Sequence, residues 1–105
     1  MVSNELFCQL ALSFPGVIAL PHFDRASFRV NKKIFATLLE KENLAMVKLP
    51  LAEQSVFCEI DRTVIYPVPG GWGRQGATYI ELKKIKKLIL KDALTIAYKN
   101  MNVKR

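Results

Sequence analysis

Residues 27–39, SFRVNKKIFATLL, decide the fold, because they contain two runs of strand-forming residues around a tight turn. The letters VNKK predict a hairpin with a two-residue turn, although lysine at the second turn position is less favourable than glycine. In that register Phe28 faces Phe35 across the hairpin, while Ser27 and Arg29 point to the other face of the sheet. The stretch therefore predicts an antiparallel pair of strands.

Further elements can be predicted on both sides of this hairpin. The runs GVIALP and NLAMVKL flank it between residues 17 and 49, and TVIYPV and ATYIEL follow later in the chain. Pro67 and Pro69 confine the end of TVIYPV to a sheet edge. Helical spacing of apolar residues predicts three helices, over residues 3–13 with Ser3 or Asn4 as the cap, from Pro50 to about Asp61, and from about Lys83 to Lys99.

This order of elements predicts an α+β fold, an antiparallel sheet with helices packed on one face. The length of 105 residues allows one domain, residues 1–105, and we expect only the basic tail from about Asn100 to fray. The glycine-rich stretch should join two adjacent antiparallel strands, near residues 63–68 and 77–81.

The periodicity also predicts which side of each helix is buried. For the second helix, the predicted apolar side consists of Ala52, Val56, Phe57 and Ile60. For the last helix, it consists of Ile85, Leu88, Ile89, Ala93 and Ile96. Tyr98 falls among the lysines on the opposite arc.

The net charge of +7 is concentrated at one end of the chain. Residues 1–82 hold eight Lys/Arg and eight Asp/Glu, whereas residues 83–105 hold eight Lys/Arg against Asp92 alone. A localised basic surface of this kind indicates an anionic partner. No apolar run approaches the roughly 18 residues of a membrane span, and the N-terminus lacks the basic start and the cleavage site of a signal peptide, so we expect a cytoplasmic protein without a membrane partner.

The last helix carries this charge on one arc, formed by Lys83, Lys84, Lys87 and Lys91, with Lys86 at its border. Lysines at the start of a helix oppose its macrodipole, and like charges four residues apart each cost a few tenths of a kcal/mol. Such a local cost without visible compensation is typical of a functional surface. Phosphate contacts and a merely solvated lysine face both remain open, and we favour the first.

Catalytic and metal-binding patterns are weak. His22 and Asp24 form the one His–Asp neighbourhood, and enzyme activity based on them is the least favoured hypothesis. Cys8 and Cys58 have no second ligand at metal spacing, so we expect reduced, partly buried thiols and no metal. The stretch GGWGRQG is neither a phosphate-binding Walker loop nor a dinucleotide fingerprint, and we expect no cofactor.

Trp72 and Arg74 stand among glycines in this same stretch. Trp72 can either pack over the core or stack on a base. Because indoles are mostly buried in proteins, we favour the core role, and Arg74 is the better candidate for contact.

Taken in order, the segments PGV, LPHFDRASFRVNKKIFATL, VKLPLAEQ and YPVPGGWGRQGATYIEL resemble the MmcQ/YjbR family of small bacterial proteins. The resemblance runs from about Leu12 to Tyr98 and includes the FRV-x-x-KIF core and the glycine loop. It departs from the family at Ala77, where relatives usually carry an aromatic residue, and at Asn31-Lys32, where they carry a glycine pair. It implies a CyaY-like α+β fold and DNA binding, and it supplies no catalytic residues.

The sequence thus predicts a non-enzymatic DNA-binding protein, with an oligomeric state that the sequence does not reveal. The residues expected to contact DNA are Lys83, Lys84, Lys87, Lys91, Arg74, Lys32, Lys33 and Trp72. The alternative is a protein-interaction or small-anion-binding module that uses the same basic surface.

Overall fold

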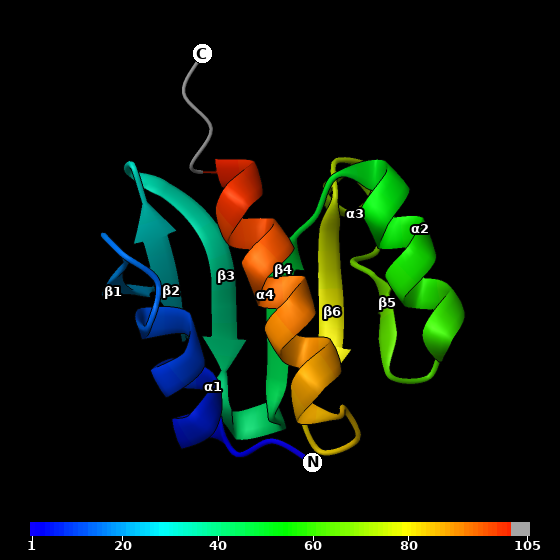
Figure 1. Ribbon diagram of the computed structural model, residues 1–105, viewed down its shortest axis with the longest axis horizontal. Helices are drawn as coiled ribbons and strands as arrows, with labels where there is room; N and C mark the ends of the chain where they lie inside the picture. Colours follow the sequence, from blue (N-terminus) through cyan, green and yellow to red (C-terminus); the bar gives the residue numbers. More distant parts are fainter. Residues whose placement is uncertain (102–105) are drawn as a thin grey trace.

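The computed structural model describes residues 1–101 as a six-stranded antiparallel sheet with helices packed on one face (Figure 1). The elements in chain order are α1 (Asn4–Leu12), β1 (Ile18–His22), β2 (Arg25–Val30), β3 (Lys33–Leu39), the 3₁₀ helix η1 (Glu40–Glu42), β4 (Leu44–Lys48), α2 (Leu51–Ile60), β5 (Ile65–Pro67), α3 (Gly71–Arg74), β6 (Ala77–Glu81) and α4 (Lys87–Met101). The strand order is β1-β2-β3-β4-β6-β5, with every neighbouring pair antiparallel. The predicted fold class is confirmed.

The structure refines the predictions for the two ends of the chain. Ser3 caps α1, because its Oγ accepts a hydrogen bond from the Leu6 amide at 3.1 Å. At the other end, Asn100 and Met101 are the last residues of α4. The rest of the tail expected to fray, residues 102–105, lies outside the described residues.

The β2–β3 hairpin has the predicted two-residue turn with a shifted register. Asn31 and Lys32 have φ angles of 52° and 65°, the pair of positive values that a tight hairpin turn of this length requires. The prediction that Phe28 faces Phe35 is wrong, because a bulge pairs Phe28 with Ala36. Phe28, Phe35 and Ala36 are all buried in the core, so the bulge lets two consecutive β3 residues face the helices.

The β5–α3–β6 region follows the prediction for residues 63–81. The β5 and β6 strands are adjacent and antiparallel, and β5 is the outermost strand of the sheet. Pro67 ends β5 as expected for an edge strand. The glycine-rich connection between the strands contains α3, a single helical turn that the sequence analysis did not predict.

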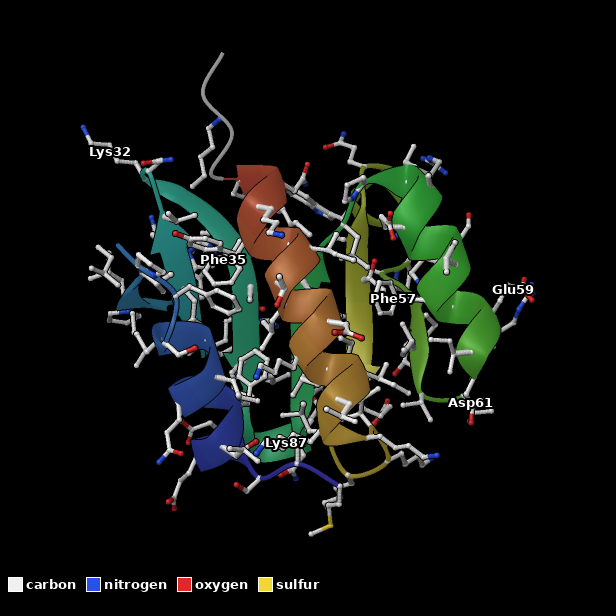
Figure 2. All side chains as sticks on the ribbon, in the orientation of Figure 1. Lys32, Phe35, Phe57, Glu59, Asp61 and Lys87 are labelled. Atoms are coloured by element: carbon white, nitrogen blue, oxygen red, sulfur yellow. The ribbon has the colours of Figure 1, made fainter. Side chains whose placement is uncertain are left out.

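The buried side of α2 differs from the predicted one. Gln54, Phe57 and Cys58 are buried, whereas Val56 is 62% exposed and Ile60 is also exposed. The rotation has a physical reason, because α2 lies at the edge of the sheet and packs chiefly against the short strand β5. Phe57, the largest apolar side chain of the helix, takes the inner position (Figure 2), whereas the smaller Val56 is exposed.

The last helix begins four residues later than predicted, at Lys87. Lys83 and Lys84 lie in a turn after β6, where the amides of Lys84 and Ile85 donate to the Glu81 carbonyl at 3.0 and 3.1 Å. Lys83 and Lys87 therefore do not form an i,i+4 pair within one helix. The later start places three lysines, Lys83, Lys84 and Lys86, before the first turn of the helix and not within it.

The buried stripe of α4 is also rotated relative to the predicted one. Leu90, Ala93, Leu94 and Ala97 are buried against β3 and β4, while Leu88 is 76% exposed. The small alanines let the helix backbone approach the sheet closely. Of the predicted stripe, Ala93 and Ile85 are buried, Ile85 from the turn before the helix, and Ile89 and Ile96 are partly buried.

Tyr98 belongs to the aromatic core and not to the lysine arc. Its ring stacks on Phe14 at 4.8 Å and meets Phe35 edge-on at 5.8 Å. Its hydroxyl donates to the Pro15 carbonyl at 2.6 Å. These contacts tie the last turn of α4 to the segment that follows α1.

Within residues 1–101, α1, α2 and α4 all lie on one side of the sheet, whereas α3 lies at one end of it, so most of the opposite face is uncovered (Figure 1). We call it the open face. One row of side chains crosses it in register over all six strands, from Leu20 through Ser27, Thr37, Met46 and Tyr79 to Tyr66. Within residues 1–101, no helix is both long and apolar enough to cross a membrane.

Candidate nucleic-acid interface

The four lysines expected to bind phosphates lie around the start of α4. Lys83 and Lys84 belong to the turn after β6, Lys87 is the first residue of α4, and Lys91 lies one turn further on. All four side chains are exposed. We call this set the lysine surface.

The lysine surface has little compensating charge. Among residues 1–101 the two ion pairs are Arg25–Asp24 and Arg62–Glu59, so the lysine surface takes part in none. Asp61 is the acidic group that senses one of these lysines. Hydrogen bonds from Thr63 lower the pKa of Asp61, and the charge of Lys84 makes a smaller contribution in the same direction.

The other predicted contact residues do not join this surface. Lys32 and Lys33 lie at the β2–β3 turn, which is at the end of the sheet where α4 finishes, whereas Lys87 lies where α4 starts (Figure 2). Arg74 and Trp72 belong to α3, which is also at the far end from Lys87 (Figure 1). The expected interface is therefore divided between the two ends of the molecule.

The glycine-rich stretch owes its composition to close backbone packing. A Cβ on Gly73 would stand 1.9 Å from the Val68 carbonyl oxygen, and one on Gly76 would stand 2.1 Å from the Leu49 carbonyl oxygen. Gly76 also has a φ angle of 106°, which side-chain-bearing residues rarely adopt. These two glycines let the α3 turn pack tightly against the backbone segments that follow β5 and β4.

A buried amide fixes this turn from the α2 side. The Nε2 atom of Gln54 lies 2.9 Å from the Gly73 carbonyl, 3.2 Å from the Ala77 carbonyl and 3.0 Å from the Thr78 hydroxyl oxygen. Gln54 is only 8% exposed, so these contacts are shielded from water. These hydrogen bonds from Gln54 fix the position of α3. The sequence gives no direct indication of them.

The expectation that Trp72 packs over the core is wrong. Its side chain is 65% exposed, and the Lys48 Nζ atom lies 5.8 Å from the centroid of its ring. The tight glycine packing therefore orders the backbone beneath the indole while leaving the indole itself accessible.

Trp72 borders a cavity of about 470 Å³ on the open face. Thr37, Met46 and Tyr79, consecutive members of the row that crosses the sheet, contribute to its lining. Arg25 and Lys48 add two cationic side chains, and His22 and Phe23 line the part contributed by the β1–β2 hairpin. The sequence analysis did not predict this group of cavity residues. Its placement of Ser27 and Arg29 on the face opposite Phe28 was the one indication that this face carries polar side chains.

The charged groups of the cavity are organised around Arg25. Its Nε donates to Asp24 Oδ1 at 3.1 Å, and this bond raises the pKa of Arg25, to which the nearby Tyr79 hydroxyl contributes less. The same bond lowers the pKa of Asp24. Asp24 is thus engaged by Arg25, the residue next to it, and not by His22, whose ring meets Phe23 at 4.8 Å.

Thiol and metal chemistry find little support in this geometry. Cys8 and Cys58 are free, and burial raises the pKa of both thiols, which disfavours the reactive thiolate. In the described part of the chain, no three His, Cys, Asp or Glu side chains gather as a metal site.

Comparisons with known proteins add no relative to this picture. No protein-family model matches the chain, and neither the curated proteins nor the solved structures that were compared gave a match.

Proposed function

We propose that the protein is a non-enzymatic DNA-binding protein that contacts the phosphate backbone through the lysine surface, Lys83, Lys84, Lys87 and Lys91. The observation that carries the proposal is the absence of ion pairs for these four exposed lysines within residues 1–101. The resemblance to the MmcQ/YjbR family points to the same class of ligand.

The physical basis is counterion release. A duplex concentrates cations around its phosphates, and each lysine that replaces such a cation frees it into solution. Four contacts should give a slope of log K against log salt of about −3 to −4, from about 0.9 per phosphate. Backbone contacts position a protein without reading base sequence, so affinity should be similar on unrelated duplexes.

Replacing all four lysines with glutamine tests the proposal. The buried stripe of α4 is untouched, so the variant should fold as the parent does. Its salt slope on duplex DNA should fall to near zero, and its affinity at low salt should fall on every duplex sequence.

A matched control removes the same charge elsewhere. It replaces four exposed lysines outside the lysine surface with glutamine: Lys32, Lys33, Lys41 and Lys99. Because the sequence analysis expected Lys32 and Lys33 to contact DNA as well, the control also tests whether these two contribute. This control should keep most of the parent slope. Equal losses in both variants would mean that net charge, and not the lysine surface, governs binding.

The alternative occupants of the lysine surface are a small anion or an acidic protein segment. If the parent binds heparin but no duplex at low salt, and the four-lysine variant loses heparin binding, the alternative replaces the DNA proposal. Retention of full duplex affinity by the four-lysine variant would reduce the lysine surface to a solvated face.

A further inference from the structure

The cavity on the open face is separate from the lysine surface. It is lined by residues of β1, β2, β3, β4 and β6 and by Trp72 of α3. Its strand residues alternate with the core residues Ala36, Val47 and Ile80, which face the helices. The cavity and α4 are therefore on opposite sides of the sheet.

We propose that this cavity binds an unpaired nucleotide of a single-stranded nucleic acid, with its base on the indole of Trp72 and its phosphate near Arg25 and Lys48. This proposal shares with the proposed function only the class of ligand, a nucleic acid, and it does not depend on the lysine surface. The residues that carry it are different ones.

The first argument is the exposed aromatic surface. Trp72 is 65% exposed and Phe23 is 94% exposed, and both border the cavity, to which Tyr79 also contributes. Exposed apolar groups that gather around one hollow often mark a binding site, and bases stack on such rings regardless of sequence.

The second argument is rigidity. Gly73 and Gly76 pack against the backbone of neighbouring segments, and Gln54 holds the carbonyl of Gly73 from inside the molecule. The turn beneath Trp72 is therefore ordered before a ligand arrives. A preorganised backbone reduces the conformational entropy that is lost on binding, which favours a recognition role over an accidental exposure.

The third argument is charge. The cavity contains the cations Arg25 and Lys48 against one acid, Asp24, which is bridged to Arg25. This balance suits an anionic ligand. The Lys48 Nζ atom lies over one face of the Trp72 ring, 5.8 Å from its centroid, so a base stacked on the other face would have its phosphate within reach of an ammonium group.

The fourth argument is size and shape. A volume of about 470 Å³ falls at the lower end of the range of roughly 300–1,000 Å³ for ligand sites and suits a group of nucleotide size. Paired bases in a duplex already stack on their neighbours and present only their edges. An unpaired base is therefore the form that can lie flat on Trp72.

Trp72 is the only tryptophan of the chain, so its fluorescence reports directly on the site. An oligothymidylate of about eight nucleotides, within the usual site sizes of single-strand binders, should quench this emission. An abasic oligonucleotide of equal length and charge should bind without quenching. Equal quenching by the abasic strand would overturn base stacking, and equal affinity for free thymidine monophosphate would overturn the assignment to a strand.

Substitutions measured by anisotropy of a labelled oligothymidylate complete the test. Trp72→Ala should weaken binding roughly five- to hundredfold, the usual effect of losing one stacked base, while Trp72→Phe should retain part of the affinity. Neither substitution should change the affinity for the abasic oligonucleotide. An unaltered affinity of Trp72→Ala for oligothymidylate would contradict the proposal.

The phosphate contact has its own matched pair of variants, Arg25→Gln and Arg62→Gln. Both arginines are ion-paired, but only Arg25 lines the cavity. On single strands Arg25→Gln should make the salt slope shallower by about 0.7, the value for one phosphate. Arg62→Gln should leave it unchanged, and equal effects would count against the site.

The two proposals fail separately. If the four-lysine variant retains duplex binding while Trp72→Ala loses strand binding, only the proposed use of the lysine surface is wrong. If the four-lysine variant loses duplex binding and Trp72 shows no base-dependent quenching, the cavity proposal alone is wrong.

Discussion

Replacing Gln54 with leucine should destabilise the protein and loosen the turn that presents Trp72. Gln54 is buried, and its amide nitrogen is the shared donor to the Gly73 carbonyl, the Ala77 carbonyl and the Thr78 hydroxyl oxygen. Leucine is similar in size but donates no hydrogen bond, so the change removes the donor with little change in packing.

The size of the destabilisation depends on whether each acceptor keeps another hydrogen bond once the Gln54 amide is gone. The Gly73 carbonyl still accepts from the Gly76 amide at 3.1 Å, and the Ala77 carbonyl still accepts from the Val68 amide at 3.0 Å. Because a side-chain amide has two N–H bonds to share among its three acceptors, the loss is that of about two ordinary hydrogen bonds, together about 1–3 kcal/mol of unfolding free energy. In a domain of this size each kcal/mol lowers Tm by about 4–8 °C.

Urea unfolding followed by circular dichroism measures this change, and the emission of Trp72 follows the turn itself. Gln54→Glu should be worse than Gln54→Leu, because a carboxylate would face three acceptor oxygens. Ser55→Ala, an exposed change on the same helix, should stay within about 0.5 kcal/mol of the parent. If Gln54→Leu unfolds at the parent urea concentration, the buried amide does not hold α3 and the argument for a rigid Trp72 site fails.

Two further predictions concern the helix layer and the open face. Leu90→Ala should cost about 2–5 kcal/mol of unfolding free energy because Leu90 is fully buried, whereas Leu88→Ala should cost less than about 0.5 kcal/mol. Urea unfolding midpoints in the reverse order would support the buried stripe predicted from sequence. The hydrogen bond from the Tyr66 hydroxyl to Glu81 raises the pKa of Tyr66 from 10.0 to about 12, so its stabilising contribution is complete below pH 10 and is lost as the pH rises toward 12. Ultraviolet titration should show one late tyrosine that titrates earlier in Glu81→Gln, and an unchanged titration would refute the assignment.

The sheet could be predicted from sequence because its signals are local. Strand composition, the Asn31-Lys32 turn and the two prolines at and just after the end of β5 each act within a few residues, and together they fix the order of the elements. The register could not be fixed in the same way. The bulge that pairs Phe28 with Ala36 depends on how both Phe35 and Ala36 pack against the helices, and this packing is a long-range effect.

The helix boundaries and faces show a second limit. The run KKIKKLIL repeats at helical spacing from Lys83 onward, yet the chain forms a turn through Ile85 before α4 begins at Lys87. Periodicity alone does not distinguish a helix from a buried turn that precedes one. The rotated stripe has a related origin, because burial in α4 follows the close packing of Ala93 and Ala97 on the sheet.

The lysine surface was predictable and the cavity was not, for the same physical reason. Lys83, Lys84, Lys87 and Lys91 are close together in sequence, so any compact structure keeps them near one another. Residues of the cavity, such as Arg25, Lys48 and Trp72, come from distant segments and meet only through the pairing of the strands. The sequence shows their chemistry but not their proximity.

The two proposed surfaces differ in the form of nucleic acid that can reach them. The molecule measures only 31 × 30 × 26 Å, whereas duplex DNA is stiff over about 150 base pairs. A duplex that lies along the lysine surface therefore cannot turn around the sheet to the open face, and its binding should not depend on Trp72. A single strand bends freely and can reach the cavity, where its bases are available for stacking. Sensitivity to Trp72 on single strands, combined with insensitivity on duplexes, is thus the pattern that the fold itself requires of the two proposals together.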